Sequence, residues 1–173
     1  HSLFTSCGFN VLLSSPSTYH NYESQLKAVM SDNICFPAKL VHSHIAELDR
    51  KLSELSEERR TKNEESNSSD TNAKQDDSSL LTHHSSQNRI FYPYVVYERK
   101  EDERTDNSYN CPIVSAYSDV VRSSMNLKTQ MDSPIITFSD EKLLWKQIKA
   151  YLKTLGVKER VARVAFKRAL ADQ

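Results

Sequence analysis

The chain has 173 residues, enough for one domain with a hydrophobic core and too few for two ordinary domains. Hydrophobic residues make up 38% and charged residues 27%, and lysine plus arginine balance aspartate plus glutamate at 23 each. A neutral chain has no global field of the kind that binds nucleic acid or an acidic membrane surface. No apolar run approaches the roughly 20 residues that span a bilayer.

The chain begins with His1 and lacks the basic and apolar regions of a secretory signal peptide. We therefore expect a cytoplasmic protein whose sequence is truncated at its N-terminus. The three cysteines, Cys7, Cys35 and Cys111, are an odd number at wide spacings. A secreted disulfide framework normally has an even and denser set, so we expect reduced thiols or metal ligands.

The first part of the chain predicts helices around one short strand. Residues 3–9 are typical of a helix end that Gly8 closes in a left-handed conformation. The apolar run 9–13 predicts a buried strand, and helical spacing follows over 21–30. Pro37 then opens a long amphipathic helix. The apolar face of this helix is formed by Leu40, Val41, Ile45, Leu48, Leu52 and Leu55.

Residues 56–88 form a polar, low-complexity stretch in the middle of the chain. Serine, asparagine and charged residues dominate it, so it cannot bury enough apolar surface to offset the entropy lost on ordering. We interpret it as a disordered insertion within a single α/β domain that spans 1–173. His83 and His84 lie in it, but adjacent histidines in a serine-rich tract usually belong to a solvated loop.

Aromatic and β-branched residues return over 89–97, which predicts a strand. Pro93 excludes a central position in the hydrogen-bonded ladder, because proline has no N–H to donate. A helix is expected over 113–125 and a further strand over 134–138.

Two helices are expected at the end of the chain. Ser139 or Asp140 caps the first of them, and Gly156 stops it. The second, over 158–171, has a basic face formed by Lys158, Arg160, Arg163, Lys167 and Arg168. Without interleaved aromatic residues, this face indicates a solvated or partner-facing surface. Because helices separate the strands, the sequence predicts an α/β fold with a parallel sheet flanked by helices.

Cys35 and Cys111 are the residues that best support a functional site. Each lies in a loop ahead of a helix with a nearby proline, Pro37 or Pro112. A helix N-terminus presents free N–H groups and a positive dipole, which favour a thiolate. Thiolates bind iron and zinc, so the pair predicts a redox or metal site, although two cysteines do not complete a four-ligand cluster. The alternative that each is a small buried hydrophobic residue stays open.

Other candidate residues have more ordinary interpretations. Cys7 lies in an apolar helix end and is expected in the core. His42 and His44 are two positions apart on a helix, so they cannot chelate one ion together. Each is expected to be partly buried or solvated, although His42 is near enough to the helix start to approach a ligand there. Lys39, in the first turn, is a candidate anion contact.

The familiar catalytic motifs are absent from the sequence. It has no Walker A loop, no G-x-G-x-x-G, no H-E-x-x-H and no nucleophile elbow. With only two glycines, it is not expected to form a backbone cradle for phosphate. The sequence nominates no base–nucleophile pair, and whether the chain is an enzyme stays open.

Four segments resemble a known protein family. They are FTSCGF at 4–9, DNICFPAKLVHSHI at 32–45, FYP at 91–93 and YNCPIV at 109–114. These segments are similar to the region downstream of the ATPase modules in large activases related to 2-hydroxyglutaryl-CoA dehydratase activators. That region is itself similar to the subunits of 2-hydroxyacyl-CoA dehydratases. The resemblance covers most of the chain outside the polar insertion.

This resemblance implies a Rossmann-like α/β unit that holds a [4Fe-4S] cluster on cysteine thiolates, with Cys35 and Cys111 in the ligand positions. Activators of this family use ATP hydrolysis to drive a low-potential electron onto such a cluster, in anaerobic metabolism. The implied partners are the ATPase modules of the same polypeptide and a 2-hydroxyacyl-CoA dehydratase. The ATPase module, any further cluster ligand and the family's first strand lie outside these residues, and the polar insertion is unusual for the family.

The leading hypothesis is an iron–sulfur-binding, or formerly iron–sulfur-binding, domain of an activase-related protein. The alternative is a cluster-free α/β module that docks a protein partner or a CoA ester in the crevice beyond the carboxyl ends of the strands. A structural zinc domain is less favoured, because neither cysteine belongs to a close C-x-x-C pair. Neither hypothesis includes a nucleic-acid or membrane partner.

Overall fold

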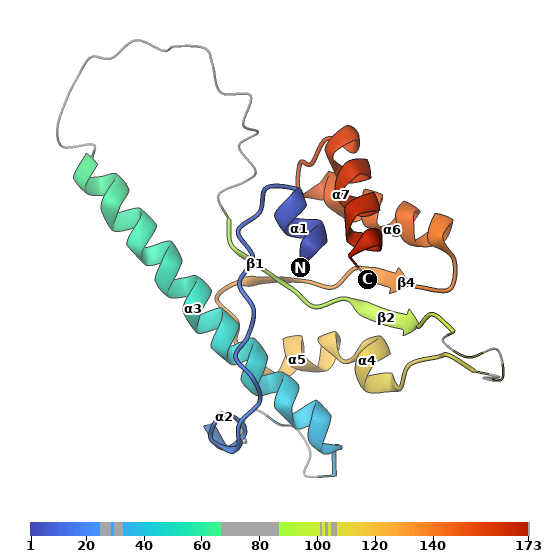
Figure 1. Ribbon diagram of the computed structural model, residues 1–173. Coiled ribbons are helices and arrows are strands. Elements are labelled where there is room, and N and C mark those ends of the chain that lie inside the picture. The colour runs from blue at the N-terminus through green and yellow to red at the C-terminus, as the bar shows by residue number, and fades with distance from the viewer. Residues whose placement is uncertain are drawn as a thin grey trace.

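Short parallel strands run through the middle of the molecule, and helices cover both of their faces (Figure 1). The computed structural model describes residues 1–24, 29, 33–66, 87–100, 102, 104 and 107–172. Their elements in chain order are α1 (Ser2–Ser6), α2 (Tyr19–Ser24), α3 (Phe36–Ser66), β1 (Arg89–Phe91), β2 (Tyr94–Tyr97), α4 (Pro112–Ala116), α5 (Ser118–Ser124), β3 (Gln130–Asp132), β4 (Ile135–Thr137), α6 (Glu141–Thr154) and α7 (Glu159–Ala171). The predicted α/β class with parallel strands is confirmed.

The strands form two parallel pairs that follow one another. β1 pairs with β3, and β2 pairs with β4. Pro93 lies between β1 and β2, and Pro134 lies between β3 and β4. Each proline interrupts the hydrogen-bonded ladder there, because it lacks the N–H that a continuous ladder needs. Two backbone bonds carry the pairing across the gap: Tyr92 N donates to Asp132 O at 2.9 Å, and Tyr94 N donates to Pro134 O at 3.0 Å.

One hydrophobic cluster, called here the C-terminal core, joins α1, β4, α6 and α7. Its buried members are Cys7, Ile136, Leu144, Ile148, Leu152, Val157, Ala162, Ala165 and Phe166. α6 begins where the carboxylate of Asp140 accepts a bond from Leu143 N at 2.7 Å, and Gly156 follows its end with φ +80°. Both predicted boundaries of this helix are therefore confirmed.

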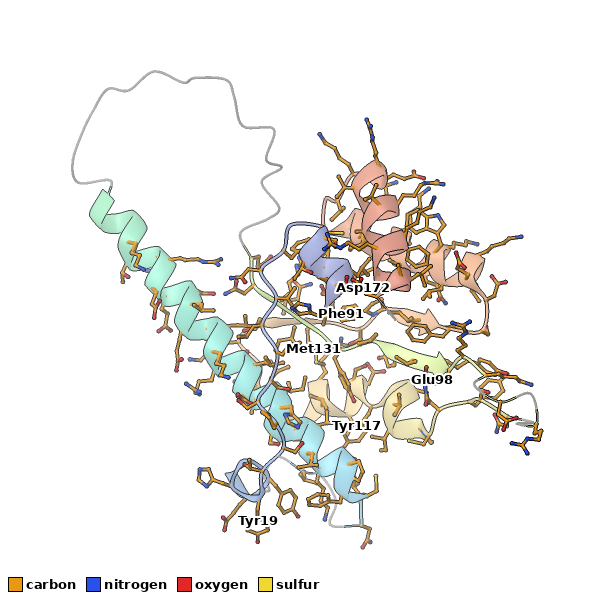
Figure 2. The ribbon with its side chains drawn as sticks, in the orientation of Figure 1. Tyr19, Phe91, Glu98, Tyr117, Met131 and Asp172 are labelled. Carbon is orange, nitrogen blue, oxygen red and sulfur yellow. The ribbon has the colours of Figure 1, made fainter. Side chains whose placement is uncertain are left out.

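A second cluster, called here the α3 core, lies on the other face of the strands. Its buried members are Ala38, Ile45, Ile90, Tyr117, Val121 and Met131, from α3, β1, β3, α5 and the residue before α5. Figure 2 shows Phe91 beside α1 and Tyr117 across the strands, next to α4 and α5. Side chains of consecutive strand residues point to opposite faces, so Ile90 packs in the α3 core and Phe91 packs against the C-terminal core.

The strand predicted over 9–13 is wrong. After α1, which Gly8 follows with φ +88°, the chain is extended but pairs with no described strand. Leu12 and Leu13 are 41% and 63% exposed. A short apolar run does not by itself specify a strand, because pairing also needs a partner edge, and here the run packs along α3.

Other boundaries also differ from the sequence expectations. α3 continues to Ser66 and includes the first eleven residues of the stretch assigned to the insertion. The two histidines at 83–84 lie outside the described residues. The helix expected over 113–125 is divided into α4 and α5 at Tyr117. The helix expected over 21–30 is described only as α2, since most of 25–32 lies outside the described part. β3 was not predicted at all.

Candidate functional site

Cys35 and Cys111 occupy equivalent local positions at the starts of two helices. Cys35 precedes α3, and its carbonyl oxygen accepts bonds from Ala38 N and Lys39 N at 3.1 and 3.3 Å. Cys111 is the N-cap of α4, and its carbonyl oxygen accepts bonds from Val114 N and Ser115 N, both at 3.0 Å. Both thiols are free and exposed.

The two helices differ in what they offer these thiols. α3 is a long helix of 31 residues with a full dipole, whereas α4 has five residues and ends at Tyr117. The division of the helix at Tyr117 therefore reduces the dipole effect on Cys111 below what an unbroken helix over 113–125 would have supplied. Cys35 has the stronger electrostatic support of the two.

Two tyrosines, the half-buried Tyr92 and the buried Tyr117, interact electrostatically with the cysteines. Burial raises the pKa of Tyr92 to about 12, with further contributions from the nearby charges of Tyr117 and Cys111. Burial also raises the pKa of Tyr117, with a further contribution from the nearby charge of Cys35. These contributions link Cys35 to Tyr117, Cys111 to Tyr92, and the two tyrosines to each other through electrostatic interactions.

The tyrosine pair belongs to a buried polar layer. Tyr117 is 4% exposed and Ser118 is 1% exposed, and the hydroxyl groups of both are buried with no hydrogen-bond partner in the described structure. Tyr92 Oη reaches Ile113 O at 3.5 Å. A buried hydroxyl without a partner costs about 1–3 kcal/mol, so this layer has unused capacity to donate to an acceptor, including a thiolate or sulfide sulfur.

His42 borders the same layer, and its role is structural. It is fully buried, with its ring edge-on to Tyr117 at 5.6 Å between centroids. Nδ1 lies 3.4 Å from Ala38 O, and Nε2 lies 3.1 Å from Ser124 Oγ. Burial lowers its pKa, against a smaller opposing effect of the backbone contact. His42 was expected to be partly buried or solvated and is instead fully buried, with both of its nitrogens facing protein atoms.

The remaining sequence candidates lie elsewhere. His44 turns its Nε2 to Ser17 Oγ at 2.8 Å, on the segment that follows α1. Lys39 is half-buried in the first turn of α3. Cys7 is 3% exposed in the C-terminal core, where burial raises its pKa, so its assignment to the core is confirmed.

The basic residues of α7 engage neighbouring side chains at the surface. Arg163 stacks over the ring of Trp145 at 5.4 Å from the centroid and contacts Glu159 at 3.2 Å. Glu159 also pairs with Lys149 of α6 at 2.7 Å. These exposed pairs tie α6 to α7 and agree with a solvated surface.

A complete metal site is not formed by the described residues alone. Within them, no group of three or more His, Cys, Asp or Glu side chains is placed to hold a metal ion. The candidate donors are the exposed thiols of Cys35 and Cys111, which act electrostatically on Tyr117 and Tyr92 respectively. Two thiolates would supply half of the four ligands that a [4Fe-4S] cluster needs.

Sequence reasoning did not single out Tyr92, Tyr117 or Ser118 as site residues. A signal for Tyr117 exists, since Ile113, Tyr117 and Val121 follow each other at helical spacing and both later residues are buried. That spacing predicts burial, but not the proximity of Tyr117 to Cys35, which depends on how α3 packs against α5.

No described helix combines the length and the apolar character that crossing a membrane requires. No curated protein and no solved structure is similar enough to match the chain. A family profile described as the CoA enzyme activase uncharacterised domain does match it, over residues 1–56 and 78–173. The unmatched residues 57–77 begin within α3 and fall inside the polar stretch 56–88. The match covers most of the chain, including both exposed cysteines, and the chain therefore belongs to the CoA enzyme activase domain family.

Proposed function

We propose that this domain binds an iron–sulfur cluster, with the thiolates of Cys35 and Cys111 as two of its ligands. The observation that carries the proposal is that both exposed cysteines lie at the starts of helices, where free N–H groups favour a thiolate. A [4Fe-4S] cluster requires four ligands, so the other two come from outside the described residues.

The chain's own residues have distinct parts in this proposal. Cys35 and Cys111 would hold the cluster, and the Tyr117 hydroxyl, buried without a partner, would be available to donate to a sulfur atom. The α3 core excludes water from the inner side of the site. A bound cluster supplies one-electron chemistry, and hydrogen bonds to its sulfur atoms raise its reduction potential.

In an activase-related protein, such a domain takes part in ATP-driven, low-potential electron transfer to a 2-hydroxyacyl-CoA dehydratase. Family membership supports this role. The partners proposed with it are ATPase modules of the same polypeptide and the dehydratase itself. The proposed setting is the cytoplasm of a cell with anaerobic metabolism.

The test is anaerobic expression of the complete natural polypeptide, followed by iron and sulfide analysis. We expect bound iron and sulfide in the wild type and a loss of most of both in the Cys35→Ala, Cys111→Ala double variant. Cys7→Ala is the matched control, because Cys7 lies in the other core and its loss should leave the cluster content unchanged. An unchanged cluster in the double variant would refute the ligand assignment.

A second candidate is a cluster-free module that docks a protein partner or a CoA ester at the same cysteines. Its support is that the described residues group no third metal ligand with the two thiols. It predicts a wild-type polypeptide without iron, together with CoA-ester binding that protects Cys35 and Cys111 from alkylation. Iron and sulfide in the wild type that disappear with the double variant would exclude it.

A further inference from the structure

A separate cavity lies between α1, α3, β1 and α6, closed on its outer side by the extended segment after Gly8. Its volume is about 510 Å³, within the range of small-molecule sites in proteins. Leu48 and Leu52 of α3 line it. At 1.5 Å rise per residue, Leu48 is roughly 20 Å along the α3 axis from Cys35. The cavity, called here the α1/α3 pocket, is therefore distinct from the cysteine site.

The walls of the α1/α3 pocket are mainly apolar. The apolar lining residues are Phe4, Phe9, Val11, Leu12, Leu13, Leu48, Leu52, Ile90, Phe91 and Leu155, joined by the ring of Tyr151. Phe4 and Phe91 meet edge to face at 4.8 Å between centroids, and Phe91 lies 5.3 Å from Tyr151, which makes one wall a packed aromatic group. Such walls suit a flexible hydrocarbon body.

The charged side chains that line this pocket are all positive. Arg59 and Arg89 line it with Asn88 and Gln87, and none of its lining residues is an aspartate or glutamate. Arg59, on the exposed last turns of α3, donates to Asn88 Oδ1 at 3.4 Å. The cavity lining therefore carries the positive charge of Arg59 and contains no carboxylate.

The second arginine of the lining, Arg89, has a hydrogen-bond donor that is not used. Its Nη1 atom contacts both carboxylate oxygens of Asp132 at 3.1 Å, whereas its Nε atom is buried with no hydrogen-bond partner in the described structure. An unpaired buried donor on a charged group costs more than a neutral one. An acceptor atom brought by a ligand would relieve this cost.

The outer wall is held in place by contacts to α3. Glu47 accepts bonds from Ser15 N and Ser15 Oγ, and Ser17 bonds to His44. Figure 1 shows this segment descending from α1 past β1 toward α2. The contacts keep Leu12 and Leu13 over the pocket even though no strand pairing holds them.

We propose that the α1/α3 pocket binds an amphipathic carboxylate, with its hydrocarbon body against the aromatic wall and its carboxylate toward the two arginines. The apolar walls alone would accept a neutral hydrocarbon equally well. Arg59 and the unpartnered Nε donor of Arg89, in a lining without acidic residues, select the anion. A charge-assisted bond contributes about 1.5–3 kcal/mol, or roughly tenfold to a hundredfold in affinity.

The test is calorimetric titration of the full chain with decanoate, and separately with decan-1-ol, below their aggregation limits. We expect decanoate to bind at one site per chain, and decan-1-ol to bind at least about tenfold more weakly. Failure of decanoate to bind, or equal binding of the alcohol, would overturn the proposal. So would binding to anionic phospholipid vesicles in place of soluble decanoate.

Two exposed positions allow variants that should not disturb folding. Leu12→Glu places a carboxylate in the pocket wall and should weaken decanoate binding about tenfold or more. Leu143→Glu is its matched control, because both leucines are 41% exposed and Leu143 lies outside the pocket lining. Arg59→Gln should weaken decanoate but not decan-1-ol, whereas Arg60→Gln, the next residue of α3, should change neither. Equal effects of a variant and its control would refute the assignment.

Discussion

His42 is a fully buried ionisable side chain that packs against Tyr117 and contacts Ala38 and Ser124. Its burial disfavours the charged imidazolium, which is why its pKa lies below the ordinary value of 6.5. The same enclosure leaves the Tyr117 and Ser118 hydroxyls without partners. At the scale of single residues, the chemistry of the site region is therefore set by desolvation more than by ion pairs.

We predict that the protein loses stability as the pH falls below about 6.5, and that His42 contributes to this loss. Below that pH the unfolded chain takes up a proton on this side chain while the folded state does not, so protonation favours unfolding. The free energy of unfolding, measured by urea denaturation at about pH 7.5 and about pH 5, should fall less in His42→Gln than in the wild type. His20→Gln, at an exposed position, is the control, and an identical pH dependence in both variants would contradict the prediction.

Helices α1, α3 and α6 have local signals at their ends, and these signals act over a few residues. Pro37 lies in the first turn of α3, the Asp140 carboxylate caps α6, and glycines at positive φ follow α1 and α6. The segment between α1 and α2 has no such signal. Its position depends on Glu47, whose side chain is 16% exposed and receives bonds from Ser15 and Lys51.

We predict that Glu47→Gln lowers the free energy of unfolding by about 1–3 kcal/mol at neutral pH, because it weakens charge-assisted bonds in a partly buried position. The contacts of Lys51 and Ser15 lower the pKa of Glu47 from 4.5 to about 2. The wild-type advantage is therefore present above about pH 4.5 and is lost as the pH falls toward 2. Urea denaturation across this range measures it.

The matched control for this prediction is Glu54→Gln on the same helix. Glu54 pairs with Arg50 at 2.7 Å, but its side chain is 54% exposed, so its loss should cost about 0.5 kcal/mol or less. Hydrogen exchange at the Ser15 amide should become faster only in Glu47→Gln. If both variants lose the same stability, Glu47 does not fix the segment in the way the contacts indicate.

At the scale of the whole molecule, two cores share the strands that separate them. Ile90 belongs to the α3 core, and the next residue, Phe91, packs against the C-terminal core. Asp132 of β3 holds both Arg89 of β1 and the Tyr151 hydroxyl of α6. Because the strands belong to both cores, we expect the described domain to unfold as one cooperative unit.

We predict that Val121→Ala, in the α3 core, lowers the urea midpoint reported by Trp145, which packs against Phe166 in the C-terminal core. Val121 is fully buried, and its truncation should cost about 2 kcal/mol. Tryptophan fluorescence and far-ultraviolet circular dichroism should shift together. Val164→Ala, at a position 66% exposed, is the control. A fluorescence transition that stays in place would show that the two cores unfold separately.

The sequence by itself determined the helices with clear capping and periodicity, the α/β class and the family. It also determined that Cys35 and Cys111 begin helices beside prolines, because these features depend on residues within one or two turns of each other. It did not reveal β3, whose pairing with β1 depends on residues about forty positions away.

Only the tertiary structure decided what surrounds those two cysteines. The packing of α3 against α5 brings Cys35 into electrostatic interaction with Tyr117, and the packing of β2 against α4 does the same for Tyr92 and Cys111. It also turned the run 9–13 from an expected strand into the wall of a cavity, since its side chains pack along α3 and its backbone joins no described strand. Local sequence sets backbone conformation, whereas contacts between distant elements decide which side chains share one environment.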